Sequence, residues 1–197
     1  MERIQGTRLS QRIYYLPGRG GHLNQGLGAA LQSKGLQLVG SELPGGADAG
    51  GFATHVDAVA ADLQREHWHR ESLVLANSFG AYLLLHALAQ LPLFVGNVLL
   101  LSPILGMVFR KDAPGGFVPP RARKILAMVE AGTFPVPRRC EIHVGSQDWQ
   151  SDPERALAIG LKIGAKVNVV PDQGHILERG YVLAVIDSWI DESISLL

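Results

Sequence analysis

Residues 72–85 read SLVLANSFGAYLLL, an apolar run with the length of a strand that passes directly into an apolar run with the length of a helix. Ser78 lies at the junction, with Ala76 two residues before it and Gly80 two residues after it. Small residues at these two positions let a strand and a helix approach closely around a strained serine. The segment is therefore predicted to form a nucleophile elbow, with alanine where the usual pattern has glycine. The other interpretation is an ordinary tight turn with a solvated serine.

Outward from this segment, strand-like and helical patterns alternate along the chain. The predicted strands are 12–16, 36–40, 72–76, 97–101, 140–144 and 166–170. Between most of them lie helical patterns: Phe52, Val56, Val59 and Leu63 recur at helical spacing, and 79–91 is apolar nearly all round. Such alternation implies right-handed crossovers and a mostly parallel sheet covered on both faces. We predict an α/β fold, a three-layer α/β/α sandwich around a six-stranded sheet.

Residues 103–139 interrupt the alternation with a proline- and glycine-rich stretch in which we predict no strand. A helix is expected at 120–130, with prolines at its start and Gly132 just past its end. The chain shows no repeat or linker, so residues 1–197 are predicted to form one domain with a short excursion at about 103–139.

Composition narrows the class of partner. The 18 basic and 18 acidic residues give a formal net charge of zero, which argues against a nucleic-acid partner and favours a small molecule. Residues 72–109 carry no charge, but polar residues, glycines and prolines divide them into strand, helix and strand lengths, so no stable membrane insertion is expected. A single cysteine, Cys140, and a start without a secretory signal predict a cytoplasmic protein. The sequence does not indicate the oligomeric state.

Two later loops offer partners for Ser78, which needs a base and an acid that orients the base. Asp148 follows the predicted strand 140–144, and His175 follows the predicted strand 166–170. Loops at the carboxyl ends of parallel strands share one edge of the sheet, so these side chains can meet Ser78 there. Asp152 precedes a proline as a helix cap does, and Asp172 lies three residues before His175 as the alternative orienting acid.

Four further histidines and the cysteine are assigned no role in catalysis. His67 and His69 flank Trp68 without a third ligand in view, so no metal site is predicted. His86, in the buried helix, and His143, in a strand, are expected to be hydrogen-bonded within the structure. Cys140 is expected to be a small buried hydrophobe.

The elbow, the Gly-x-x-Asp loop at 145–148 and the Gly-His pair at 174–175 together resemble the α/β-hydrolase superfamily over about residues 12–189. The chain is too short for the two strands with which that fold begins, so it resembles the minimal, lid-poor members, small serine hydrolases of the esterase or lipase type. The resemblance implies Ser78 as nucleophile, Asp148 as acid and His175 as base, in the chain order of this fold. It places the excursion where the family inserts its cap, and it implies no metal or organic cofactor.

Donors for a developing oxyanion are also expected. The first is the backbone N–H of Phe79, directly after the nucleophile. In the family the second follows a His-Gly pair after the first parallel strand, and alignment of LPGRGGH at 16–22 makes it Arg19, with Gly20 as the alternative. The Arg19 side chain is expected either to favour an acidic substrate group or to be solvated. The excursion is expected to contribute to the pocket wall, and its candidate side chains, which contact the acyl group or belong to the core, are Leu105, Met107, Phe109 and Phe117.

The predicted function is hydrolysis of an ester, thioester or related acyl bond of a small molecule through an acyl-Ser78 intermediate, as in a carboxylesterase or a thioesterase. One alternative is a non-catalytic interaction module on the same scaffold. Another is a dinucleotide-binding oxidoreductase, because Gly18-Arg19-Gly20 follows a strand and Glu42 follows the next one. The third glycine of that motif falls at Leu23, which argues against it.

Overall fold

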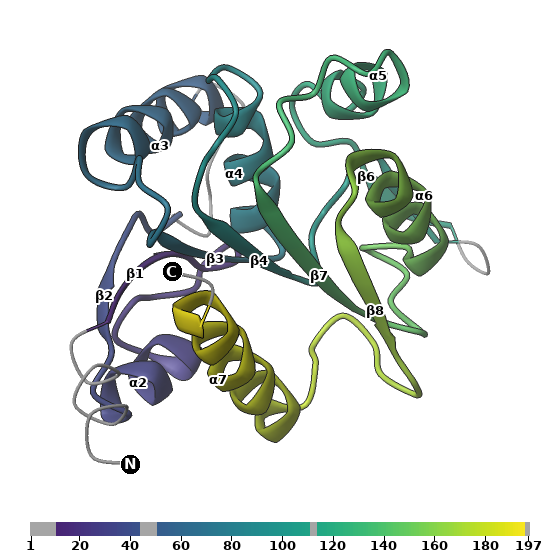
Figure 1. Ribbon diagram of the computed structural model, residues 1–197. Helices are drawn as coiled ribbons and strands as arrows, with labels where there is room; N and C mark the ends of the chain where they lie inside the picture. The colour runs from purple at the N-terminus through teal and green to yellow at the C-terminus, as the bar shows by residue number, and fades with distance from the viewer. Residues whose placement is uncertain (1–10, 44–50, 111–113, 196–197) are drawn as a thin grey trace.

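The computed structural model describes residues 11–43, 51–110 and 114–195. Within these residues six parallel strands form one sheet in the order β2-β1-β3-β4-β7-β8 (Figure 1). The strands are β1 (Arg12–Leu16), β2 (Gln37–Val39), β3 (Leu73–Asn77), β4 (Asn97–Leu101), β7 (Arg139–Gly145) and β8 (Lys166–Val170). All six predicted strands are present, with ends displaced by at most one residue.

Helices cover both faces of this sheet (Figure 1). One face carries α3 (Phe52–Glu66), α4 (Phe79–Leu88), α5 (Lys124–Glu130) and α6 (Pro153–Ile163), and the other carries α2 (Gly26–Ser33) and α7 (Arg179–Ser195). Successive residues of a strand point to opposite faces. Val74 and Ala76 of β3 accordingly pack with α3 and α4, whereas Leu73 and Leu75 pack with α2 and α7. The predicted three-layer α/β/α fold with a six-stranded parallel sheet is confirmed.

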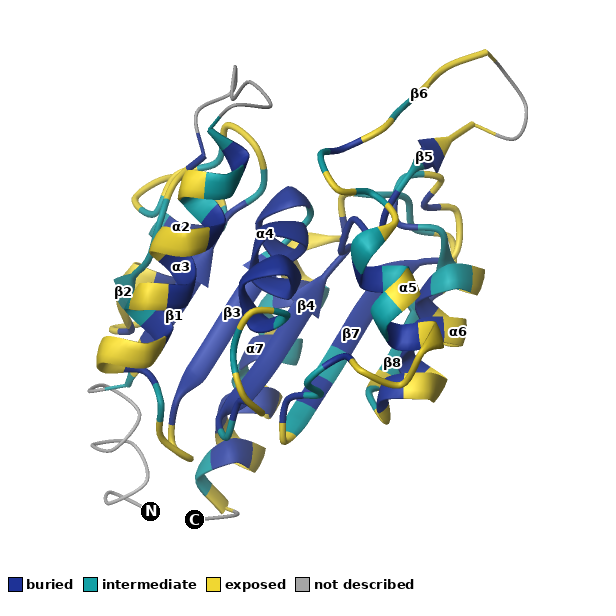
Figure 2. Cartoon of the chain, turned by 90° about the horizontal axis from the view of Figure 1, so that it is seen from above, coloured by how far each residue is buried: buried dark blue, intermediate teal, exposed yellow. Residues whose placement is uncertain are grey.

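The helix that follows Ser78, α4, lies in the interior. Every residue from Phe79 to Leu88 is buried, and Figure 2 shows the helix buried along its whole length. It ends three residues before the predicted end at 91. The N–H groups of Gln90 and Leu91 donate to carbonyls three residues back, a tighter turn that ends the helix just before Pro92.

The excursion at 103–139 contains more structure than predicted. Two short strands, β5 (Val108–Phe109) and β6 (Gly116–Phe117), pair antiparallel, so the prediction of no strand there is wrong. Each strand has only two residues, too few to show an alternating pattern in the sequence. Gly116 allows the two strands to approach, because a Cβ at this position would overlap the Val108 carbonyl oxygen. The helix α5 begins at Lys124, four residues after the predicted start, because residues 120–123 form a turn.

The sheet topology determines where loops gather. β1 pairs with β2 on one side and with β3 on the other. Successive strands are therefore added to the sheet in one direction from β1 to β2 and in the opposite direction from β3 onward. In parallel α/β sheets, such a change of strand order leaves a crevice at the carboxyl ends of the strands. The loops after β1, β3, β7 and β8 all leave from this edge, which is where the sequence places the candidate site.

Candidate functional site

The turn between β3 and α4 holds Ser78 in a conformation that side chains rarely adopt, with φ 52° and ψ −117°. Such strained backbone persists only where the surroundings enforce it, and it is common at functional sites. Gly80 allows the approach, because a Cβ there would overlap the carbonyl oxygens of Leu16 and Pro17 at the end of β1. Gly80 thus occupies a crowded position, and Ala76 is fully buried.

The segment after β4 holds the backbone of Ser78. The Ser78 N–H donates to the Leu101 carbonyl at 2.9 Å, and the Ile104 N–H donates to the Ser78 carbonyl at 3.2 Å. Both backbone polar groups of the strained residue are therefore satisfied, and its orientation depends on a neighbouring strand as well as on its own.

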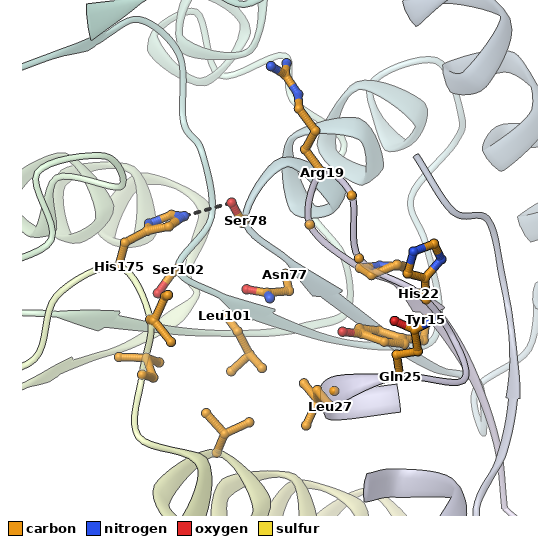
Figure 3. Close-up of a pocket in the computed structure, with 18 of the residues that line it drawn as sticks. Tyr15, Arg19, His22, Gln25, Leu27, Asn77, Ser78, Leu101, Ser102 and His175 are labelled. Carbon is orange, nitrogen blue, oxygen red and sulfur yellow. Dashed lines mark hydrogen bonds between the residues drawn. The ribbon is translucent and has the colours of Figure 1, made fainter. Parts of the chain in front are cut away.

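Ser78, His175 and Asp148, far apart in sequence, form one hydrogen-bonded chain. The Ser78 Oγ lies 2.8 Å from the His175 Nε2 (Figure 3). The His175 Nδ1 lies 2.9 Å from one oxygen of Asp148 and 3.1 Å from the other. Asp148 is buried and His175 is mostly buried, so solvent screens their interaction weakly. This geometry can pass a proton from the hydroxyl to the imidazole while the carboxylate orients the ring.

The loop after β7 keeps Asp148 ionised. Burial alone raises the pKa of its carboxyl, but a hydrogen bond from His175 and bonds from the N–H groups of Ser151 and Gln150 outweigh that effect and lower the pKa below its usual value. Ser151 was not anticipated from the sequence, and its buried Oγ lies 3.3 Å from the His175 Nδ1. Its only sequence signal is its place in the turn after an aspartate, whose side chain often accepts nearby backbone N–H groups.

The other two carboxylates considered for the acid position lie elsewhere. Asp152 caps α6, where its side chain accepts from the Arg155 N–H and Pro153 is the first helical residue, as the sequence predicts. Asp172 is exposed, and its own N–H donates to the Ser146 Oγ. Among the described residues, only Asp148 places a carboxylate within hydrogen-bonding distance of His175.

The backbone amides beside Ser78 differ in whether they are already bonded. The Gly20 N–H donates to the Leu43 carbonyl at 3.0 Å, which leaves it unavailable to a substrate. Over the part of the chain that is described, neither the Phe79 N–H nor the Arg19 N–H has an acceptor. Of the two candidates for the second oxyanion donor, this bonding favours Arg19. The Arg19 guanidinium lies over the Phe79 ring, 4.5 Å from its centroid.

A cleft of about 720 Å³ opens beside Ser78 and His175, between the loop after β1 and the start of α7 (Figure 3). Its apolar lining includes Leu27 of α2, Val182 of α7, Leu177 in the loop before α7, and Tyr15 and Leu101 of the strands β1 and β4. The side chains proposed from the excursion do not line this cleft. Leu105 is buried in the core, Phe109 is 57% exposed, Met107 is half-buried, and Phe117 lies 5.7 Å from the Arg19 guanidinium. From the sequence we expect the excursion to contribute to the pocket wall, whereas this cleft opens on the α2 and α7 side of the sheet.

The chain was compared with protein-family models, with the sequences of curated proteins and with solved structures. No family model matches the chain, and no curated protein matches its sequence. Solved structures do match: Est1E from Butyrivibrio proteoclasticus has a TM-score of 0.67 and 16% identity, covering 94% of this chain and 89% of that one. SOBER1 from Arabidopsis thaliana has a TM-score of 0.61 and 16% identity, covering 94% and 99%. The α/β hydrolase domain-containing protein 10 from mouse has a TM-score of 0.62 and 14% identity, covering 92% and 90%. This chain has the α/β-hydrolase fold.

The other histidines considered in the sequence analysis, His67, His69, His86 and His143, do not line the cleft beside Ser78. His67 is buried against the Tyr14 ring, and His69 is paired with Glu71 at the surface. His86 is fully buried in α4, and neither ring nitrogen has a partner among the residues that the structure describes, so the prediction that it is hydrogen-bonded is wrong. It lies among the rings of Phe52 and Tyr82, and burial lowers its pKa to about 4. An apolar helix sequence does not reveal whether such a ring finds a partner.

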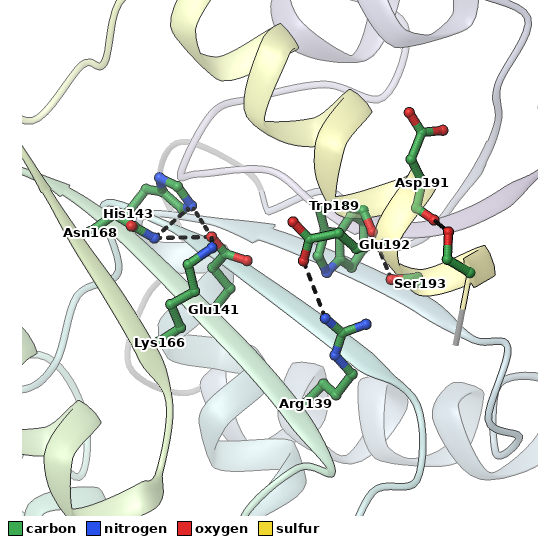
Figure 4. A network of polar contacts seen from close by, with 10 residues as sticks. Arg139, Glu141, His143, Lys166, Asn168, Trp189, Asp191, Glu192 and Ser193 are labelled. Atoms are coloured by element: carbon green, nitrogen blue, oxygen red, sulfur yellow. Dashed lines mark hydrogen bonds and ion pairs between the residues drawn. The ribbon is translucent and has the colours of Figure 1, made fainter. Parts of the chain in front are cut away.

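His143, in contrast, belongs to a polar network on β7 and β8 of the hydrolase fold, as expected of a hydrogen-bonded structural residue (Figure 4). Its Nε2 lies 2.9 Å from the Glu141 carboxylate, which also binds Lys166 at 3.0 Å and Asn168 at 2.9 Å. Its Nδ1 lies 2.7 Å from the Tyr181 hydroxyl of α7. The hydrogen bond with His143 is the largest cause that lowers the pKa of Glu141 to about 2.

Further observations concern metals, membranes and the cysteine in the described part of this α/β-hydrolase fold. No three His, Cys, Asp or Glu side chains there are grouped as ligands of one metal ion. No helix there has both the length and the apolar character needed to cross a membrane. Cys140 is buried at the start of β7, and burial raises the pKa of its thiol to about 12.

Proposed function

We propose that this chain is a serine hydrolase that cleaves an ester or thioester bond of a small molecule through an acyl-Ser78 intermediate. The observation that carries the proposal is the hydrogen-bonded chain from Ser78 through His175 to the buried carboxylate of Asp148. The strained turn at Ser78 and the unbonded N–H groups of Phe79 and Arg19 support the same conclusion.

The reaction proceeds in two halves. The His175 Nε2 takes the proton of the Ser78 hydroxyl as the Oγ attacks the acyl carbon, and the carbonyl oxygen gains the negative charge. The N–H groups of Phe79 and Arg19 donate to that oxygen; in acyl-transferring enzymes each such donor contributes about 3 kcal/mol. The protonated His175 then gives its proton to the leaving alcohol or thiol. Water attacks the acyl-enzyme by the reverse sequence, which releases the acid and restores Ser78.

Asp148 orients the ring and stabilises the imidazolium in both halves. Because its lowered pKa keeps it ionised, it accepts from the Nδ1–H and leaves the Nε2 lone pair directed at Ser78. The bonds from Gln150 and Ser151 fix the carboxylate in that position.

The structural neighbours support hydrolysis of carboxylic esters. They include carboxylesterases of Nitrososphaera gargenis, at 11% identity and a TM-score of 0.62, and Est1E, which was also solved with ferulic acid bound. A carboxylesterase or a thioesterase therefore fits this site best, and p-nitrophenyl esters and acyl-thioesters of equal chain length distinguish the two.

Labelling with a fluorophosphonate probe tests the nucleophile directly. The wild-type chain is expected to be labelled on Ser78, and Ser78→Ala is expected to abolish both labelling and ester turnover while leaving the circular dichroism spectrum unchanged. Ser195→Ala, a serine whose Oγ bonds to a helix carbonyl at the end of α7, serves as the matched control and should remain labelled. A folded wild-type protein that is inert to the probe would refute the proposal and favour the interaction module.

A further inference from the structure

The cleft beside Ser78 has a one-sided charge. Its lining residues include Arg19, Arg179, His22 and His175, although the Arg19 guanidinium itself lies over the Phe79 ring. Among the described residues that line it there is no aspartate or glutamate. The chain as a whole has equal numbers of acidic and basic residues, whereas the arginines that line this cleft have no acidic residue beside them in the lining. Clefts lined by one sign of charge attract ligands of the opposite sign.

Three carboxylates of the described residues that adjoin lining residues of the cleft in sequence or by hydrogen bond already have partners. Glu42 lies 2.9 Å from the His22 Nδ1 and accepts from the Leu23 N–H at 2.6 Å. Glu178 accepts from two N–H groups at the start of α7, and Asp148 is buried behind His175. Over the described ranges no carboxylate pairs with the Arg179 guanidinium, in contrast to Arg12 and Arg139, which bind Glu66 and Glu192.

The cleft also contains unused hydrogen-bond donors. The first residues of α2, Gly26 and Leu27, line it, and Gln25 before them makes no side-chain capping bond. The N–H groups at such a helix start favour an anion. In addition, Ser102 lines the cleft (Figure 3) and is almost fully buried, and its hydroxyl has no hydrogen-bond partner within the described part of the chain. A buried hydroxyl without a partner is costly unless a ligand or water satisfies it.

We propose that the cleft between α2 and α7 binds an anionic oxygen group of the substrate, so that the preferred substrates are esters or thioesters that carry a negative charge. This inference rests on the proposed hydrolase function of Ser78. Arg179 and the start of α2 supply the attraction, and the Ser102 hydroxyl supplies a hydrogen bond. The charged group lies on the acyl side or on the alcohol side of the scissile bond.

Matched esters test the charge preference and its side. On the acyl side, mono-p-nitrophenyl adipate is compared with its methyl ester and with p-nitrophenyl hexanoate. On the alcohol side, 4-carboxyphenyl butyrate is compared with phenyl butyrate. We expect one of the two anionic esters to exceed its neutral counterparts in kcat/KM by about tenfold or more, the effect of one hydrogen bond to a charged group. The preference should decrease as ionic strength rises.

Charge-removing variants then locate the preference in the cleft. Arg179→Gln is expected to lower the ratio of anionic to neutral kcat/KM by about tenfold. Arg70→Gln, which removes the same charge from an exposed position that does not line the cleft, should leave the ratio unchanged. Equal ratios for wild type and Arg179→Gln, or no anion preference on either side of the scissile bond, would overturn the proposal.

Binding without turnover separates this proposal from the proposed function. Calorimetric titration of Ser78→Ala with adipate and with 4-hydroxybenzoate, against dimethyl adipate and phenol, is expected to show binding of an anion that Arg179→Gln weakens. Binding of neither anion would overturn the cleft proposal even if Ser78 hydrolyses neutral esters. Anion binding in a protein without Ser78-dependent turnover would support the cleft and refute the hydrolase.

Discussion

Replacing Asp148 with asparagine is expected to lower kcat by about 10⁴-fold without unfolding the chain. The Asp148 Oδ1 accepts from the N–H groups of Gln150 and Ser151, both at 2.9 Å, so the asparagine oxygen must stay there. Its NH₂ group then occupies the position of Oδ2, 2.9 Å from the His175 Nδ1. Facing a donor, Nδ1 must accept, and the ring proton moves to Nε2. A protonated Nε2, 2.8 Å from the Ser78 Oγ, cannot take the hydroxyl proton.

The magnitude follows from what it costs to restore the active tautomer. The asparagine would have to turn its NH₂ toward two backbone donors and leave both N–H groups without an acceptor, at about 1–3 kcal/mol each. A total near 5 kcal/mol corresponds to a factor of about 10³–10⁴.

Hydrolysis of p-nitrophenyl hexanoate, with circular dichroism as the check on folding, measures the effect. Asp152→Asn and Asp172→Asn are the matched controls, because they make the same change at a helix cap and at an exposed loop position. Both controls should stay within a few-fold of wild type. A folded Asp148→Asn protein within tenfold of wild type, or a larger loss in the Asp172 variant, would refute the assignment of the acid.

Three further predictions concern packing. His86→Leu removes two buried nitrogens that have no partner, so urea unfolding should show a gain of about 1–3 kcal/mol. Because the folded pKa of His86 is about 4 against 6.5 unfolded, wild-type stability should fall by about 3 kcal/mol as pH decreases from 6.5 to 4, and the variant should lack that loss. Gly80→Ala should reduce both stability and turnover, because its Cβ forces the Leu16 and Pro17 carbonyls away from the Ser78 turn. Cys140 should react with Ellman's reagent only after denaturation, since its thiol is buried with a pKa of about 12; rapid labelling of the native protein would contradict its burial.

The sequence predicts the sheet well because its strands are continuous aliphatic runs bounded by turns. Because these strands are parallel, the sequence alone also predicts that the loops carrying Ser78, Asp148 and His175 lie at one edge of the sheet. Their hydrogen bonds appear in the structure as expected, while their catalytic roles stay predictions that the experiments above test. The assignment of residues 1–197 to one domain also stays a prediction.

Features that depend on distances between elements were not predictable in this way. The cleft lies between α2 and α7, and its lining by Tyr15 and Val182 depends on how far apart those helices lie on the sheet. The position of Ser151 behind His175 depends on the conformation of a single loop. His86 lacks partners because the aromatic rings around it offer none, a property of the packed interior rather than of the helix that carries it.

The attachment of Ser78 to the segment after β4 has a consequence for damaged or partly opened molecules. Local opening costs less free energy than global unfolding in most proteins. If the end of β4 detaches, the bonds to Leu101 and Ile104 are lost, and the serine relaxes to an ordinary backbone conformation that no longer presents its oxygen to the imidazole. Such a molecule loses its activity altogether and does not act on a wider range of substrates. Loss of turnover is then an early sign of disorder at the centre of the sheet.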